Sequence, residues 1–345
     1  MVNMKKKYSK KNNIKKSFFC GKTFFILLLI LISGCKGKKD AKQAIENVRT
    51  GSEGIAVSFL KNNPPDVIHV ESGGDNTIKV VLQLNNKGAY PQPNEAGNGK
   101  IYLSGFDRDI IKFNDNSKDL GNLALEGKST INPNGGIDFV TFNGIIEYES
   151  LNVDKYEPTL LATACYLYHT VAGPQVCIDP DPYSTITQKK VCEIKDTSLS
   201  NQGAPVAVTK IVEEALATKT QFKITIKNVG SGDVIKRDSG EKCDPTGDIK
   251  LEREDINKVY VREVKIGNKD LSASDCKPFA EDKFIRLING EGSIICELAK
   301  SDYGASNTAY TTPLKIELSY FYKNTAERKL QIKKESSSTA VSDES

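Results

Sequence analysis

Six cysteines offer the clearest covalent chemistry in this 345-residue chain. An even number of cysteines in a chain that leaves the cytoplasm predicts disulfide bonds. Zinc binding is the competing interpretation, but there is no C-x-x-C pair and the only histidines are His69 and His169, so we expect no zinc. The cysteines expected to form disulfides are Cys165, Cys177, Cys192, Cys243, Cys276 and Cys296.

A polar segment provides the second candidate chemistry. Asp115, Ser117, Asp119 and Glu126 have the 1, 3, 5, 12 spacing of a calcium-binding loop. The sixth position of such a loop needs glycine for its sharp turn, and this chain has Leu120 there. We therefore expect a solvated polar loop, and these four residues remain calcium candidates only. Asp179 and Asp181 are a further acidic pair that solvation explains equally well.

Catalytic patterns are missing from the sequence. There is no G-x-S-x-G signature. Gly127-Lys128-Ser129-Thr130 resembles the end of a phosphate-binding loop, but Asn122 stands where that loop needs its first glycine. We expect His69 on a strand surface and His169 in a turn, each without a nucleophile partner. The sequence therefore predicts a chain that is not an enzyme and has no cofactor.

The N-terminal 34 residues have the composition of a secretory signal. Eight lysines and no acids precede an apolar run from Phe24 to Ile32. At 1.5 Å per residue this nine-residue run spans roughly 14 Å, about half of a ~30 Å hydrocarbon layer. We therefore expect residues 1–34 to be a signal peptide. Removing its eight lysines leaves 40 basic residues against 44 acidic ones, and that mild acidity argues against a nucleic-acid partner.

The end of the apolar run, Ile32-Ser33-Gly34-Cys35, resembles the lipobox of prokaryotic lipoproteins. The resemblance implies that Cys35 becomes the first mature residue and carries lipid. Residues 35–50 would then be a tether that holds the protein at the extracytoplasmic face of the cell membrane. An uncleaved anchor, or a cleaved signal with an incidental cysteine, remains the alternative.

The roughly 310 remaining residues read as an all-β protein. Short runs of Val, Ile, Thr and Tyr alternate with Gly, Pro, Asn and Asp, a strand-and-turn composition. A repeat divides the chain into two copies: Ser319-Tyr320-Phe321-Tyr322 matches Cys165-Tyr166-Leu167-Tyr168 at an offset of 154, and Lys258-Val259-Tyr260-Val261 matches Lys100-Ile101-Tyr102-Leu103. We expect tandem β-sandwiches over residues 51–180 and 191–332, a linker over 181–190 and a disordered tail over 333–345.

Each copy also contains a strand that ends in Asn-x-Gly, at Asn86-Lys87-Gly88 and Asn228-Val229-Gly230. This pattern resembles the CARDB-type and related immunoglobulin-like modules of prokaryotic surface proteins. The resemblance implies immunoglobulin-like sandwiches that act as spacers or adhesive units.

The repeat also bears on the disulfide pairing. Ser319 replaces Cys165 and Gln331 replaces Cys177 in the second copy, so this pair disappears together. We expect Cys165–Cys177 across a hairpin. The other four cysteines allow three pairings, of which Cys243–Cys276 with Cys192–Cys296 is favoured.

Four tyrosines of the repeat, Tyr166, Tyr168, Tyr320 and Tyr322, alternate along their strands, so each pair shares one face. Packing is the simpler interpretation, and an exposed ladder for ligand contact is the functional one. The predicted role is therefore structural, adhesive or assembly-related, with a protein partner in the cell envelope. A ligand- or ion-binding lipoprotein that uses the module junction is the alternative.

Overall fold

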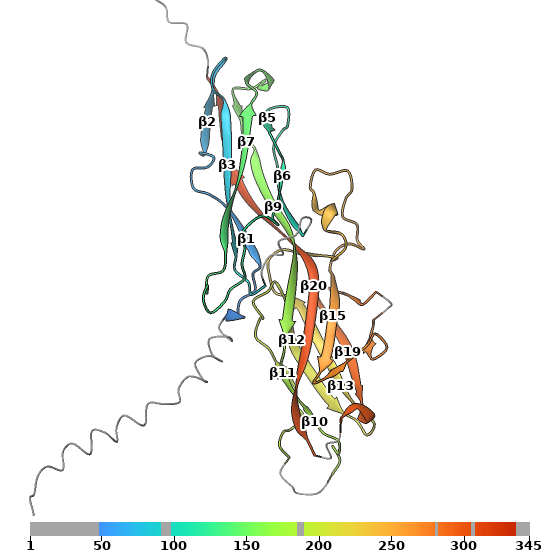
Figure 1. Ribbon diagram of the computed structural model, residues 1–345. Helices are drawn as coiled ribbons and strands as arrows, with labels where there is room; N and C mark the ends of the chain where they lie inside the picture. Colours follow the sequence, from blue (N-terminus) through green and yellow to red (C-terminus); the bar gives the residue numbers. More distant parts are fainter. Residues whose placement is uncertain (1–47, 91–97, 185–189, 280–281, 305–307, 336–345) are drawn as a thin grey trace, which may run out of the picture. The chain divides into compact units, whose positions relative to one another are not determined.

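The described residues are almost entirely β-strand. The computed structural model describes residues 48–90, 98–184, 190–279, 282–304 and 308–335, which form 21 strands in four sheets (Figure 1). Three 3-10 helices connect strands: η1 (Tyr148–Ser150), η2 (Gly240–Cys243) and η3 (Lys300–Asp302). Among the described residues, no helix has the length and apolarity needed to cross a membrane. The fold is an all-β sandwich, as predicted.

One sheet belongs to the first half of the chain alone. Its strand order is β1–β3–β7–β5, with β1 at Ile55–Phe59, β3 at Thr77–Asn86, β7 at Ile137–Ile146 and β5 at Ile111–Phe113. Alternate residues of β3, among them Ile78, Val80, Leu82 and Leu84, are buried. This period of two places one side of the strand in the core.

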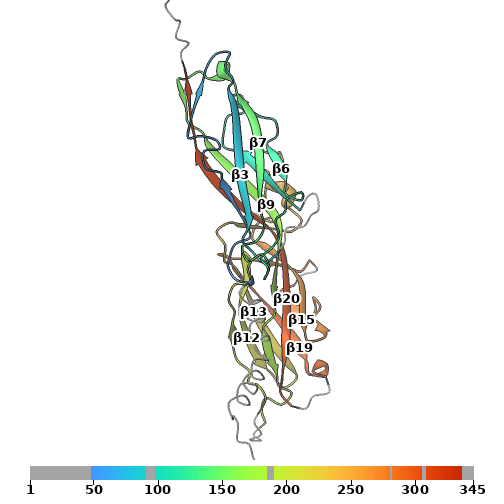
Figure 2. The same ribbon diagram turned by 60° about the vertical axis from the view of Figure 1, so that its left-hand side comes forward.

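A second sheet belongs to the second half alone (Figure 2). Its order is β11–β12–β13–β19–β17, with β11 at Thr197–Ser198, β12 at Val206–Ala215, β13 at Lys219–Asn228, β19 at Glu291–Ala299 and β17 at Cys276–Lys277. Phe222, Ile224 and Ile226 of β13 are fully buried at alternate positions. The two sheets therefore bury one side each by the same pattern.

The largest sheet combines strands from both halves. Its path is β16–β15–β20–β9–β4–β6, and β10 and β14 pair with β20 while β18 pairs with β15. The bounds are β16 Lys269–Asp270, β15 Lys258–Ile266, β20 Tyr310–Lys329, β9 Thr159–Ala172, β4 Gly99–Ser104, β6 Ser117–Asp119, β10 Gln175–Ile178, β14 Asp233–Ile235 and β18 Phe284–Arg286. A three-stranded sheet, β2–β21–β8, consists of β2 (Val67–Val70), β21 (Gln331–Lys334) and β8 (Lys155–Tyr156).

A two-stranded antiparallel ribbon joins the halves (Figure 1). Residues 155–178 run antiparallel to residues 310–333, and in every partner pair the two residue numbers add up to 488. The ribbon is therefore in one register from β8 through β9 to β10, and from β20 through to β21. We call residues 155–178 and 310–333 the ribbon below.

The ribbon exchanges strands between the two sandwiches. The first part of β9 pairs with β4 of the first half, whereas β10 pairs only with β20 of the second half. In return, β21 at the end of the chain pairs with β2 and β8 of the first half. The predicted division into 51–180 and 191–332 is therefore wrong, and residues 181–190 do not separate two modules. Lys333 and Lys334, expected in a disordered tail, belong to β21.

The register makes the sequence repeat a local symmetry. Leu167 and Phe321 are repeat equivalents, 154 residues apart, and they pair with each other. Tyr166 consequently pairs with Tyr322, and Tyr168 with Tyr320. One predicted match needs a correction: Lys100 lies opposite Cys165 and Tyr260 lies opposite Ser319, so Lys100 is equivalent to Tyr260 and not to Lys258. A shift of two residues preserves the face of the strand, which is why the sequence pattern hid it.

The four tyrosines are buried and hold the start of each first strand. The Ile55 amide donates to the Tyr166 hydroxyl at 2.9 Å, and the Val206 amide donates to the Tyr320 hydroxyl at 3.2 Å. The opposite ribbon strand completes each clamp: Asn324 Nδ2 donates to the Ile55 carbonyl. Thr170 Oγ1 donates in the same way to the Val206 carbonyl. Each sandwich is therefore fixed by hydrogen bonds from both halves of the chain.

The Asn-x-Gly pattern belongs to the same arrangement. The Tyr168 hydroxyl donates to Asn86 Oδ1, which also accepts from the Gly88 amide. The second half repeats both contacts, with the Tyr322 hydroxyl and the Gly230 amide donating to Asn228 Oδ1. A Cβ on Gly88 would lie 1.9 Å from the Tyr168 hydroxyl oxygen, so only glycine fits there.

The disulfide pairing differs from the prediction. The pairs are Cys165–Cys243, Cys177–Cys192 and Cys276–Cys296. Cys165–Cys177 is wrong because the segment from β9 to β10 continues along β20 and makes no hairpin, which leaves these two residues roughly 40 Å apart along the strand direction. Cys243–Cys276 and Cys192–Cys296 are wrong because Cys276 faces Cys296 on the neighbouring strand.

Candidate functional site

The outer side of strand β7 exposes large apolar side chains. Val140, Phe142 and Ile146 point into the core, whereas Ile137, Phe139 and Ile145 are 48, 50 and 51% exposed. A surface strand normally alternates apolar-in with polar-out. This strand is apolar on both sides.

The neighbouring strand β3 extends this surface without adding much charge. We define the β7 face as the ten outward positions of the two paired strands, of which Lys79 is the one charged member. The face consists of Thr77, Lys79, Val81, Gln83, Asn85, Ile137, Phe139, Thr141, Asn143 and Ile145. Val81 is itself buried, because the Asn63 carbonyl accepts its amide and holds the following loop against it.

The second half contains a matched surface. Asn86 corresponds to Asn228, and pairing from these residues makes Ile137 equivalent to Glu291, again 154 apart. We define the β19 face as the equivalent ten positions of β13 and β19. It consists of Lys219, Gln221, Lys223, Thr225, Lys227, Glu291, Ser293, Ile295, Glu297 and Ala299.

The two faces differ in chemistry despite their shared backbone arrangement. Half of the β19 face is charged, and it contains ion pairs between Lys219 and Glu297 at 2.7 Å and between Lys227 and Glu291 at 3.1 Å. Such a surface is well solvated. The β7 face instead leaves apolar area in water, which is the usual property of an interaction surface.

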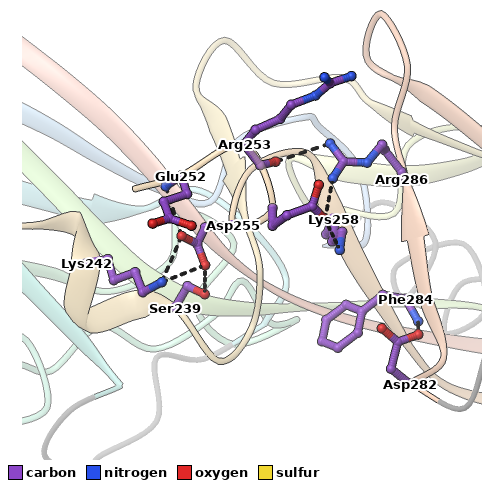
Figure 3. A network of polar contacts seen from close by, with 10 residues as sticks. Ser239, Lys242, Glu252, Arg253, Asp255, Lys258, Asp282, Phe284 and Arg286 are labelled. Atoms are coloured by element: carbon purple, nitrogen blue, oxygen red, sulfur yellow. Dashed lines mark hydrogen bonds and ion pairs between the residues drawn. The ribbon is translucent and has the colours of Figure 1, made fainter. Parts of the chain in front are cut away.

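A long loop covers the other side of the shared sheet (Figure 3). Asp255 organises it by accepting from Ser239 Oγ at 2.6 Å and from Lys242 Nζ at 2.9 Å. Its carboxylate also accepts from the Glu252 amide. Burial by itself raises the pKa of Asp255, but these hydrogen bonds outweigh burial and lower the pKa to about 2. A carboxylate held in this way stays charged and keeps the loop ordered at neutral pH.

An ion-paired cluster lies beside this carboxylate (Figure 3). Glu254 pairs with Lys258 at 2.8 Å and with Arg286 at 2.9 Å, and Arg286 also donates to the Arg253 carbonyl. The Cys165–Cys243 disulfide fastens the same loop to the ribbon over a small apolar cluster that includes Tyr102 and Phe321. The network is therefore a structural support for the loop.

A cavity of about 420 Å³ lies next to that loop, and residues of both halves line it. Lys100 and Tyr102 come from β4, while Arg237, Glu241 and Asp244 come from the loop. Burial, and then the charges of Asp244 and Asp119, raise the pKa of Tyr102 to about 12. The cavity therefore offers two cations, two carboxylates and a neutral phenol to a polar ligand.

The calcium candidates do not come together as a loop. Ser117 and Asp119 lie in β6, which pairs with β4, and Leu120 is fully buried. Asp115 forms an ion pair with Lys118, and Asp119 accepts from the Gly121 amide. The described residues contain no group of three or more His, Cys, Asp or Glu side chains that could hold a metal ion.

The acidic pair after β10 is engaged by a lysine. Asp179 is buried and pairs with Lys190, which also donates to the Asp181 carbonyl. Asp179 also accepts from the Asp181 amide. These contacts use the oxygens that a cation would need.

The two histidines have different fates. His69 lies exposed on β2 beside Glu335, as predicted. His169 is not in a turn: it lies in β9, buried, with its ring stacked on Tyr90 at 4.4 Å between centroids. Burial, followed by the charges of Arg262 and Arg237, lowers its pKa to about 4.

The tyrosines are core residues, so the interpretation as an exposed ladder is wrong. Burial raises the pKa of Tyr166, Tyr168 and Tyr320 far above the usual range, and that of Tyr322 to about 12. Cys35 and the signal peptide lie outside the described residues. The β7 face was missed by the sequence reasoning, although the signal was present in a strand, residues 137–146, that is apolar at both odd and even positions.

Comparison with known proteins adds little to this description. No family model matches the chain, and no curated protein does. Among solved structures it is similar to the YadV chaperone (8% identity, 80% of this chain, 100% of the other, TM-score 0.18). It is also similar to the C-terminal domain of the Streptococcus agalactiae AgI/II polypeptide BspA (8%, 82%, 100%, TM-score 0.14). A third likeness is the collagen-binding domain of Erysipelothrix rhusiopathiae surface protein RspB (9%, 81%, 97%, TM-score 0.13). These scores are too low to support a functional argument, so the fold assignment depends on the strands themselves.

Proposed function

We propose that this chain is an exported, non-enzymatic structural or adhesive protein of the cell envelope that binds a protein partner through the β7 face. The β7 face carries this proposal, because the duplicated half of the same chain has a charged surface at the equivalent positions. The backbone arrangement therefore does not require Ile137, Phe139 or Ile145 to be apolar.

Two further observations support export and a scaffold role. All six cysteines of the described residues form disulfides, which persist in oxidising compartments outside the cytoplasm. The ribbon joins both sandwiches in one register and the Cys165–Cys243 bond links the halves covalently. Such an arrangement suits a protein that must present a binding surface without unfolding.

The β7 face is tested by substitution at matched positions. Full-length wild type, Phe139→Asp and the equivalent Ser293→Asp would each be used to capture proteins from envelope extracts of the source cell. We expect Phe139→Asp to lose a specific partner that wild type and Ser293→Asp retain in equal amounts. Equal capture by all three proteins would contradict the proposal.

Membrane attachment through Cys35 is part of the same proposal and has its own test. Cys35→Ser should move the protein from the membrane fraction to the soluble fraction, because the lipid would have no sulfur to modify. Cys20→Ser is the matched control, since that cysteine lies in the predicted signal and should leave the fractionation unchanged. Membrane retention of Cys35→Ser would count against a lipid anchor.

The cavity shared by both halves favours a second candidate, the binding of a polar small molecule at the junction. Lys100 and Arg237 would contact acidic groups of such a ligand and Glu241 would contact a basic group. Native mass spectrometry of protein purified from cells tests this candidate. A bound molecule that is lost in Arg237→Ala and kept in Arg253→Ala would support it, whereas an unliganded mass for the wild type would not.

A further inference from the structure

A buried carboxylate in the second sandwich lacks a complete set of hydrogen-bond partners. Glu213 follows Ile211 on the inward side of β12 and is 8% exposed. Its Oε2 accepts from the Cys177 amide at 3.2 Å. Its Oε1 is buried and has no hydrogen-bond partner among the described residues. An incompletely satisfied buried carboxylate is costly, and it is uncommon unless it has a role.

The environment of Glu213 explains how it holds a proton or a cation. Burial raises the pKa of its carboxyl to about 7, against a smaller opposing effect of the Cys177 amide. The equivalent position in the first half is Lys61, which is exposed in a turn, so the fold does not demand an acid there.

Glu213 lines a cavity of about 460 Å³ between β10 of one sheet and β11–β12 of the other. The loop of residues 190–195 borders it and is tied to β10 by the Cys177–Cys192 disulfide. Gln175 and Thr197 add further polar side chains, and Val176 adds apolar surface. The volume lies within the ~300–1,000 Å³ range of small-molecule sites.

The charges around the cavity leave Glu213 without a counter-ion. Lys190 is paired with Asp179, and Lys195 and Glu193 lie exposed at the rim. Across the cavity, the nearby Tyr303 hydroxyl is bonded to Thr220. Each of these groups is either satisfied or solvated, in contrast to Glu213 Oε1.

We propose that this cavity binds a small organic cation through a primary ammonium group that donates to Glu213 Oε1. A single carboxylate matches a single positive charge. Calcium takes six to eight oxygen ligands, several of them carboxylates, and the described residues contain no acidic cluster of that kind. This inference is independent of the β7 face and of the lipid anchor.

Cadaverine is a suitable probe, with 1-pentanol as its uncharged counterpart of equal chain length. Isothermal titration of the full chain should detect cadaverine and not 1-pentanol. Glu213→Gln should weaken cadaverine binding about tenfold or more, a loss of ~1.4 kcal/mol. Glu214→Gln is the matched control, because Glu214 is exposed on the opposite side of β12 and should bind like wild type.

A pH series on the wild type keeps the test decisive if Glu213→Gln folds poorly. The amine stays protonated between pH 6 and 8 while the Glu213 carboxyl with a pKa of about 7 ionises, so affinity should rise about tenfold over this interval. Failure to bind cadaverine at pH 8, equal binding by folded Glu213→Gln, or affinity independent of pH would each overturn the proposal.

Discussion

The two halves of this chain share one internal design and differ on their outer surfaces. In both halves a Tyr-x-Tyr pair, an Asn-x-Gly turn and a clamped first strand occupy equivalent positions and make equivalent hydrogen bonds. The outward positions of β3 and β7 are largely uncharged, whereas those of β13 and β19 are rich in lysine and glutamate. Conservation of the interior between the copies, together with divergence outside, assigns stability to the first set of residues and specificity to the second.

The comparison also separates geometry from chemistry. Ile137 and Glu291 occupy the same place in the same kind of sheet, so their backbone environments cannot explain the difference. The expected effects of substitution follow the same division: large in the shared interior and small on the faces.

The largest effect is expected at the glycine of the Asn-x-Gly turn. A methyl group on Gly88 would approach the Glu53 and Gly203 carbonyl oxygens to 2.7 Å, besides its clash with Tyr168, and backbone atoms move little. Gly88→Ala should destabilise the protein by more than about 3 kcal/mol, measured by urea unfolding. Gly173→Ala, which has no heavy atom within 4 Å of the new methyl, should have little effect. A mild loss for Gly88→Ala would break the interpretation of the turn.

Removal of disulfides should distinguish the bond between the halves from the bond within one half. Cys165–Cys243 spans 78 residues and Cys177–Cys192 spans 15. In the loop-entropy description their contributions are about 4.5 and about 3 kcal/mol. The Cys165→Ala/Cys243→Ala variant should therefore lose about 1.5 kcal/mol more than Cys177→Ala/Cys192→Ala in chemical denaturation. The reverse order would show that the halves are held mainly by the ribbon.

The two asparagines should differ because their burial differs. Asn86 is fully buried and also donates to the Tyr90 and Leu125 carbonyls, while Asn228 is partly exposed. Asn86→Ala should cost about 3 kcal/mol and Asn228→Ala about 1 kcal/mol, because water can replace some of the lost bonds only at the second site. Thermal unfolding followed by circular dichroism measures both. Equal costs would mean that the two turns are equivalent in energy as well as in geometry.

A pH effect should be confined to His169, whose repeat equivalent is Lys323. The folded pKa of about 4 lies below the ordinary value of 6.5, so the unfolded chain binds a proton first as the pH falls. Stability should be complete above pH 6.5 and fall by about 1–3 kcal/mol towards pH 4, after allowance for partial solvent screening. His169→Gln should lack this part of the acid loss. Identical pH profiles would contradict the burial argument.

The smallest effect on stability is expected on the faces. Phe139→Lys and Ile295→Lys should each change the free energy of unfolding by less than about 0.5 kcal/mol, because both side chains are partly solvated. Phe139→Lys should nevertheless lower retention on a hydrophobic-interaction column more than Ile295→Lys, which lies among charged neighbours. Equal retention would weaken the distinction between the faces.

Local patterns in the sequence predicted the strands and the repeat well. Alternation in residues 77–86 and 219–228 placed the correct side chains in the core, and the offset of 154 identified the equivalent tyrosines. These features depend on neighbours within one strand, which the sequence contains directly.

The strand exchange could not be predicted in the same way. Whether residues 175–178 turn back or continue along β20 depends on a partner more than 130 residues away, and Gly173-Pro174 fits either outcome. The wrong disulfide pairs follow from that one decision. The cavity at Glu213 has the same origin, because its walls come from strands that only the exchange brings together.

The position of β21 has a consequence for biosynthesis. The strand at residues 331–334 lies between β2 and β8, so a sheet that begins at residue 67 stays incomplete until nearly the whole polypeptide has been made. Loss of the last fifteen residues through a premature stop codon would therefore injure the N-terminal half, far away along the gene. A chain that cannot finish folding early also remains threadable, which is the condition that passage through a narrow secretion channel requires.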